Sequence, residues 1–126
     1  MRCPCGLGPP YEDCCGPIHG GGAAPTAERL MRARYSAFAV EDERYLLASW
    51  HPSTRPGSVG FDPTQRWVGL EVVATTAGGL LDAEGTVEFR ARYEQGGRPG
   101  VLHEESRFRR EAGRWTYVGP VSLTRG

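Results

Sequence analysis

The sequence predicts an α+β fold in which a curved antiparallel sheet wraps an N-terminal helical hairpin, preceded by a small cysteine-rich knuckle. Three observations support this prediction: two segments with helical spacing, four later segments that alternate apolar and polar residues, and four cysteines near the start of the chain. The chain has 126 residues, the size of one domain core with a short appendage. We therefore assign residues 1–22 to the knuckle and a glycine linker, and residues 23–126 to the main domain.

The cysteine-rich segment has neither helical nor strand periodicity, so it needs something other than an apolar core to hold a shape. Cys3 and Cys5 form a Cys-x-Cys pair, and Cys14 and Cys15 are adjacent. Four thiolates on so short a segment supply a closed tetrahedral shell for zinc, with Zn–S distances of about 2.3 Å. The alternatives are two disulfides or four free thiols. Because neighbouring cysteines pair only through strained rings, and a reducing compartment does not keep such bonds, we predict zinc.

Other residues of this segment suit a metal site. Gly6, Gly8 and Gly16 allow the backbone to turn tightly around an ion. Backbone N–H groups together with Arg2 are expected to offset the negative charge of four thiolates. His19 is a further candidate ligand, but four cysteines already complete a tetrahedral shell.

Two helices are predicted to follow the linker. Thr26 suits the N-cap of the first, with Glu28 in its first turn and apolar residues at helical spacing: Ala27, Leu30, Met31, Tyr35 and Phe38. The second begins near residues 41–42 and ends at His51-Pro52, with one face formed by Tyr45, Leu46, Ser49 and Trp50. Residues 52–63 have turn chemistry and are long for a connection, so we expect a loop that is either mobile or functional.

Four strands are predicted at residues 67–75, 86–94, 101–110 and 114–118, with hairpin turns at 95–100 and 112–113. Alternation indicates which side chains face the core. The inward set is Val87, Phe89, Ala91 and Tyr93 on the second strand, and Leu102, Glu104, Ser106 and Phe108 on the third. Glu104 therefore shares the apolar face of the sheet.

Residues 3–16, which read CPCGLGPPYEDCCG, resemble the SEC-C motif found at the C-terminus of the SecA translocation ATPase and in small bacterial proteins. Residues 25–38, 50–52, 85–89, 103–108 and 113–115 resemble the YchJ family. The resemblance implies a zinc-type SEC-C motif followed by a cone-shaped domain similar to nuclear transport factor 2, and it implies no established activity. In SecA the residues between the cysteine pairs are lysine-rich and contact the acidic chaperone SecB. Residues 9–13 here carry two acids and no cation, which disfavours that docking mode.

Glu104 and His51 are the candidate catalytic residues of the main domain, with Trp50, Tyr93 and Phe108 as candidate pocket walls. A carboxyl group in an apolar pocket has a raised pKa that suits proton transfer, and a nearby imidazole shares such work. The competing interpretation is structural. In that case an arginine neutralises Glu104, His51 caps a helix end, and Trp50 belongs to the core.

Composition limits the classes of function. Fifteen basic and fifteen acidic residues give a formal net charge of zero, so we expect no nucleic-acid partner. No apolar run is long enough to span a bilayer, and the start lacks a secretory signal, so we expect a cytoplasmic protein without membrane contact. The leading hypothesis is a zinc-binding adaptor whose knuckle contacts a protein partner. The alternative is a small-molecule enzyme or ligand carrier that uses the interior of the main domain.

Overall fold

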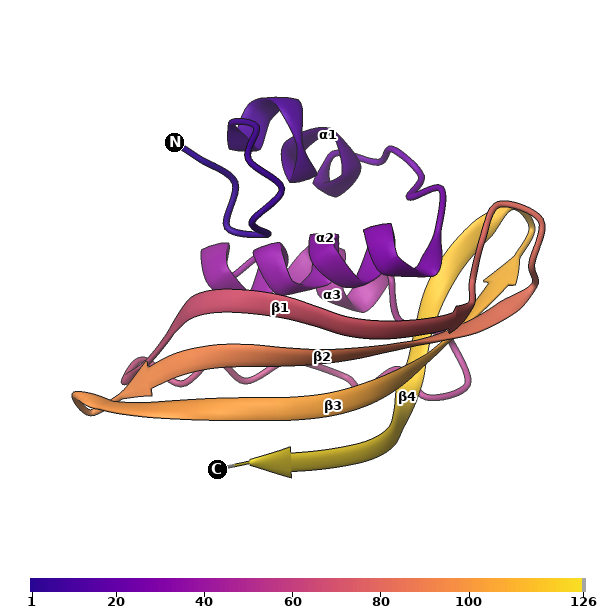
Figure 1. Ribbon diagram of the computed structural model, residues 1–126. Coiled ribbons are helices and arrows are strands. Elements are labelled where there is room, and N and C mark those ends of the chain that lie inside the picture. The colour runs from indigo at the N-terminus through magenta and orange to yellow at the C-terminus, as the bar shows by residue number, and fades with distance from the viewer. Residues whose placement is uncertain (126) are drawn as a thin grey trace.

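The computed structural model describes residues 1–125 and contains an N-terminal knuckle, two packed helices and a four-stranded sheet (Figure 1). The sheet is an antiparallel meander in the order β1-β2-β3-β4, so the predicted α+β class is confirmed. No helix in residues 1–125 is both long and apolar enough to cross a membrane. In chain order the elements are η1, a 3-10 helix (Tyr11–Asp13), α1 (Cys15–His19), α2 (Ala27–Val40), α3 (Glu43–Ala48), β1 (Gln65–Ala77), β2 (Glu84–Gln95), β3 (Arg98–Glu111) and β4 (Arg114–Arg125).

Helix α2 lies between the knuckle and the curved sheet (Figure 1). The main apolar core forms where α2 meets the sheet, and it includes Leu30, Met31 and Tyr35 from the helix and Val87 and Phe108 from the strands. All five side chains are almost completely buried, and burial of this kind is the dominant stabilising contribution to folding. The predicted arrangement, a curved sheet wrapped on an N-terminal helical hairpin, is therefore confirmed, and α2 supplies the buried core residues of that hairpin.

The two sides of α2 carry side chains of different size. The N-cap prediction is confirmed, because the Thr26 hydroxyl accepts a hydrogen bond from the backbone N–H of Arg29 at 3.1 Å. Large apolar residues face the sheet, whereas Ala33 and Ser36 are fully buried against the knuckle. These small side chains allow the knuckle to approach the helix closely. The helix ends where Glu41 adopts a left-handed conformation, with φ of 57°.

Helix α3 is shorter than predicted. It begins after the Asp42 cap and ends at Ala48, so Trp50 lies outside it. The segment after α3 pairs with β4 instead. His51 N–H donates to the Tyr117 carbonyl at 2.8 Å, and Tyr117 N–H donates to the Ser49 carbonyl at 2.8 Å. This long-range backbone pairing replaces the last helical turn that local periodicity predicts.

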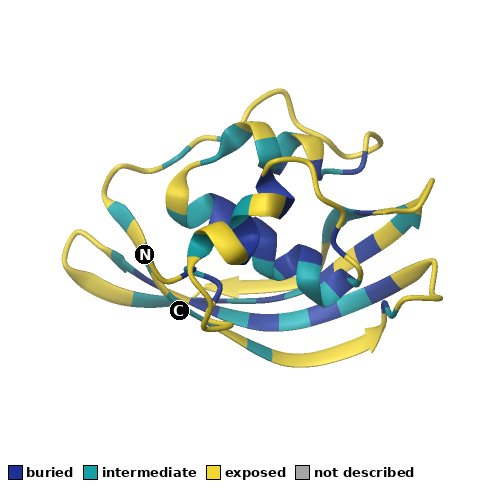
Figure 2. Cartoon of the chain, turned by 90° about the horizontal axis from the view of Figure 1, so that it is seen from above, coloured by how far each residue is buried: buried dark blue, intermediate teal, exposed yellow. Residues whose placement is uncertain are grey.

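The strands confirm the predicted alternation and extend past the predicted ends. Buried and less buried residues alternate along the sheet (Figure 2), and both predicted inward sets are buried. The hairpin between β2 and β3 turns at Gly96 and Gly97, whose positive φ values of 57° and 82° suit a two-residue turn. Strand β4 continues through Pro120 to Arg125, because β4 is an edge strand, where proline is tolerated.

Candidate metal centre and inner pocket

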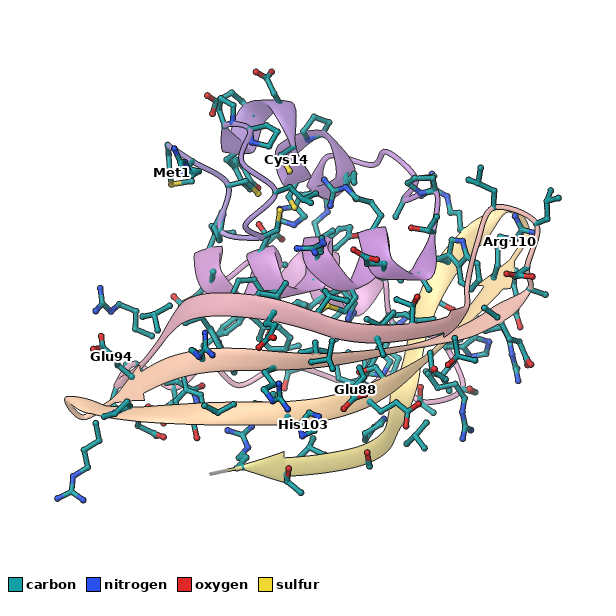
Figure 3. The ribbon with its side chains drawn as sticks, viewed as in Figure 1. Met1, Cys14, Glu88, Glu94, His103 and Arg110 are labelled. Carbon is teal, nitrogen blue, oxygen red and sulfur yellow. The ribbon has the colours of Figure 1, made fainter. Side chains whose placement is uncertain are left out.

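Two local structures bring the four cysteines together. Residues 2–10 form a loop closed by a bridge between Arg2 and Pro10, and the N–H of Cys3 donates to the Pro9 carbonyl at 3.0 Å. Gly6 and Gly8 provide the turns with φ of 84° and 110°, as predicted for these glycines. The chain then enters η1 and α1, and Cys14 is the residue that precedes α1, with Cys15 as its first residue. Figure 3 shows Cys14 in the layer above α2.

The four sulfur atoms form a compact, buried cluster. All four Sγ atoms lie within 4.8 Å of one another, and those of Cys5 and Cys14 are 3.5 Å apart. Tetrahedral zinc with Zn–S distances of about 2.3 Å requires S···S distances of about 3.8 Å, so the cluster fits such an ion. The cysteines are free thiols, and their exposed fractions are 3%, 0%, 8% and 0% in chain order. The disulfide alternative is therefore not found in this structure.

Burial and hydrogen bonds together set the pKa values of the thiols when no metal is bound. Burial raises the pKa of Cys5 and of Cys15, because it disfavours the thiolate. Burial also acts against the thiolate of Cys3, but hydrogen bonds from the backbone of Cys5 and Cys15 lower its pKa to about 7. Four neighbouring thiols cannot all ionise together without a compensating cation. A divalent ion supplies that compensation and displaces the protons.

Arg29 of α2 is the cationic residue that donates hydrogen bonds to the sulfur atoms. Its guanidinium donates to Cys15 Sγ at 3.4 Å through Nη1 and to Cys14 Sγ at 3.3 Å through Nη2. Burial alone would lower the pKa of Arg29, but the bonds and charges of these cysteines raise it. Arg2, for which we predicted such a role, is exposed, and the arginine that donates to the sulfurs is Arg29. Nothing in the local sequence distinguishes Arg29 from its neighbours, because only the packing of the knuckle on α2 reveals its partners.

The knuckle packs firmly on α2. Arg32 Nη1 donates to the Cys5 carbonyl at 3.0 Å, and Cys3 Sγ lies 3.7 Å from Ser36 Oγ. The His19 ring lies 2.8 Å from the Ala33 carbonyl through Nε2 and 2.6 Å from the Tyr11 hydroxyl through Nδ1. Both ring nitrogens are thus engaged, and His19 stays outside the sulfur shell.

A second candidate site is a cavity of about 370 Å³ between α2 and the sheet. Among the candidate residues from the sequence, Glu104, Trp50 and Phe108 line it. Residues 60–62 of the long loop also line it, and the Phe61 ring packs on Phe38 with centroids 6.3 Å apart. The loop after α3 therefore contributes a wall to the cavity.

The polar groups of the cavity are held by specific partners. Glu104 Oε2 accepts hydrogen bonds from the Tyr117 hydroxyl at 3.1 Å and from the Ser106 hydroxyl. Burial, together with the charge of Glu104, raises the pKa of Tyr117. Arg34 is buried, which lowers its pKa to about 10, and its guanidinium lies 4.8 Å and 4.4 Å from the ring centroids of Trp50 and Tyr117. Sequence reasoning missed Arg34, although an arginine at the spacing of Met31, Tyr35 and Phe38 was a usable signal.

Two predicted site residues lie outside the cavity lining. His51 is buried, but its Nε2 lies 3.0 Å from Glu111 Oε1 and its Nδ1 lies 2.7 Å from Ser53 Oγ. The prediction that His51 supplies an imidazole near Glu104 is therefore wrong, because pairing with β4 directs the histidine toward the end of β3. Tyr93 is buried in the core and does not line the cavity, so the prediction that Tyr93 forms a wall of the pocket is wrong.

Comparison with known proteins identifies the family. A family model described as "YchJ, middle NTF2-like domain" matches residues 26–120. The chain belongs to the YchJ family. A UPF0225 protein of Streptomyces avermitilis is 56% identical over 117 residues, covering 92% of this chain and 81% of the relative. A UPF0225 protein of Xanthomonas oryzae is 56% identical over 119 residues, covering 92% of this chain and 91% of the relative.

Two solved structures share the whole fold, including the knuckle. The solution structure of a SEC-C motif containing protein from Rhodopseudomonas palustris has a TM-score of 0.83 and 34% identity, and covers 98% of this chain and 100% of that protein. The crystal structure of a SEC-C motif containing protein from Psychrobacter arcticus has a TM-score of 0.77 and 30% identity, and covers 98% of this chain and 84% of that protein. The YchJ chain described here therefore combines a cysteine cluster of metal-binding type with an NTF2-like domain.

Proposed function

We propose that this protein binds zinc through Cys3, Cys5, Cys14 and Cys15, and that the zinc-bound knuckle is a protein-interaction module. The observation that supports zinc is the buried cluster of four sulfurs within 4.8 Å of one another. Soft thiolate ligands in a tetrahedral set favour zinc or iron among common metals. Four protein ligands leave no open coordination position, so the ion has a structural role rather than a catalytic one.

The surface offered to a partner is the outer knuckle loop, residues 6–10. All five residues of this loop are exposed, and the Leu7 side chain is 47% exposed. Glu12 and Asp13, which follow the loop, are exposed as well. An apolar contact beside two acids suits a partner surface that is apolar with a basic rim.

We infer the class of partner from the surface charges of the sheet, and a cytoplasmic location from the chemistry of the cysteine thiols. On the sheet, basic residues are interleaved with acids: His103 lies 2.6 Å from Glu88 (Figure 3), and Arg90 lies 3.6 Å from Glu71. Such pairing disfavours nucleic acid, which requires an uninterrupted basic surface. A reducing compartment such as the cytoplasm keeps the cysteines available for the metal.

Affinity capture with three variants tests the adaptor function. Leu7→Ser alters the outer knuckle loop and leaves the ligands intact, Cys14→Ser removes a ligand, and Val73→Ser is the control, because Val73 is 40% exposed on β1. We expect wild type and Val73→Ser to retain the same partner, and the other two variants to lose it. Retention by Leu7→Ser would contradict the proposed surface. If wild type captures no specific partner, the knuckle serves only to fasten the N-terminus to the domain.

A further inference from the structure

The cavity between α2 and the sheet has the size and walls of a small-molecule site. Its volume of about 370 Å³ lies within the range of about 300–1,000 Å³ that is typical of ligand pockets. Apolar and aromatic side chains dominate its walls: Met31, Tyr35, Phe38, Phe61, Trp67 and Phe89. An apolar ring system that binds against these walls gains free energy by burial.

Arg34 of α2 is a buried cation in the lining of this cavity. It is only 5% exposed, and none of the ion pairs within residues 1–125 includes it. Buried charges in proteins are normally paired with an opposite charge. Glu104, the other buried charged residue of the lining, accepts hydrogen bonds from the Ser106 and Tyr117 hydroxyls instead. Arg34 therefore has no counter-ion in direct contact within residues 1–125.

The guanidinium of Arg34 uses one of its three nitrogens for hydrogen bonds. Nη1 donates to the Leu46 carbonyl at 2.8 Å and to Ser49 Oγ at 2.7 Å, so both of its hydrogens are engaged and the side chain is fixed against α3. The guanidinium carbon lies 4.8 Å and 4.4 Å from the ring centroids of Trp50 and Tyr117, which also line the cavity. Nε and Nη2 have no acceptor within residues 1–125.

The two free nitrogens of Arg34 form a fork that suits a planar anion. Nε–H and one N–H of Nη2 point in the same direction in the guanidinium plane, which is a geometry that binds both oxygens of one carboxylate. Among the buried and half-buried residues of 1–125, only Trp50 Nε1 is both sealed from solvent and without a partner, so the Arg34 fork retains accessible surface. Because Nη1 is directed at α3 and Arg34 lines the cavity, this fork opens toward the cavity.

We propose that the cavity binds an apolar, ring-containing carboxylate, whose oxygens accept hydrogen bonds from Arg34 Nε and Nη2 while its ring packs on the aromatic walls. One guanidinium balances a single negative charge, which favours a carboxylate over a phosphate monoester with a charge of about −1.5 to −2 at pH 7. The acidic lining residues Glu41 and Asp62 are exposed, so solvent and salt weaken their repulsion of the ligand. This site is separate from the knuckle and does not depend on the zinc proposal.

Three probes with the same ring system test the proposal on the full chain by NMR. They are 2-naphthoate, its neutral isostere 2-naphthamide, and 2-naphthyl phosphate. We expect 2-naphthoate to bind at least about tenfold more tightly than either of the others, because only this probe matches the fork in both shape and charge. It should shift the Nε–H signal of Arg34. The Nε–H signal of Arg32, whose nitrogen donates to Glu28, should not move.

Variants separate the fork from general packing. Arg34→Lys keeps the positive charge but removes the planar fork, so it should weaken 2-naphthoate binding about tenfold and change 2-naphthamide binding by less than about threefold. Arg90→Lys is the matched control and should change neither affinity, because Arg90 pairs with Glu71 on the other face of the sheet. If Arg34→Lys does not fold, the comparison of the three probes on wild type decides the question.

Four results would overturn the proposal. They are a smaller preference for 2-naphthoate over 2-naphthamide, tighter binding of 2-naphthyl phosphate, an unshifted Arg34 Nε–H signal at millimolar 2-naphthoate, and wild-type affinity for 2-naphthoate in folded Arg34→Lys.

Discussion

Replacing Arg29 with glutamine tests whether α2 is part of the metal centre. The wild-type guanidinium donates to Cys14 and Cys15 at 3.3 Å and 3.4 Å, and both bonds strengthen when the sulfurs become metal-bound thiolates. Loss of outer-shell partners of this kind lowers metal affinity by about 10- to 100-fold, which corresponds to about 1.4–2.8 kcal/mol. We expect Arg29→Gln to weaken zinc binding by that factor while the fold of the main domain is retained.

The assay is competition for zinc against a chelating dye at pH 7, under anaerobic and reducing conditions. Arg32→Gln is the matched control, because Arg32 lies on the same helix and donates to the Cys5 carbonyl and to Glu28 rather than to sulfur. Its affinity should stay within about threefold of wild type, since no thiolate bond is lost. Arg29→Lys should fall between the two, because an ammonium group keeps the charge but lacks the planar fork that reaches two sulfurs. Wild-type affinity in Arg29→Gln, or an equal loss in Arg32→Gln, would refute the reasoning.

Three further predictions concern the main domain. Thr26→Ala should lower the unfolding free energy by about 1 kcal/mol in urea titration, because α2 loses its cap; an unchanged midpoint would contradict that role. Gly85→Ala should destabilise by about 2 kcal/mol in the same assay, because the new Cβ would lie 2.4 Å from Gly78 Cα. Burial raises the pKa of Tyr35 and of Tyr45 to about 12, so only the unfolded chain ionises them just above pH 10. Thermal stability should therefore fall from pH 10 to 12, and Tyr35→Phe should reduce the slope.

Local patterns predicted the elements of the fold well, because each element depends mainly on its own residues. The Thr26 cap, the alternation along β2 and β3, and the inward position of Glu104 all follow from period and capping chemistry. The end of α3 was missed because pairing of His51 with Tyr117 overrides helical periodicity. The extent of β4 was missed because the edge position of the strand permits Pro120.

The cysteine cluster and the cavity could be predicted to different extents, because the cluster comes from one short segment and the cavity from segments far apart in the sequence. The cysteine cluster lies within one short segment, so spacing alone predicted that its four sulfur atoms converge. Its cationic partner Arg29 comes from α2, and long-range packing of this kind leaves no pattern in the sequence. The cavity was only partly predicted: Glu104 and Phe108 follow from strand alternation, whereas the direction of His51 is set by a contact with Glu111 that lies far away in the sequence.

The most direct test of the metal centre is X-ray absorption at the zinc edge, with elemental analysis, on protein purified without added metal. The account predicts one zinc per chain and a single shell of four sulfur neighbours at about 2.3 Å. Iron in place of zinc, fewer than four sulfur neighbours, or reduced protein that carries no metal would contradict it.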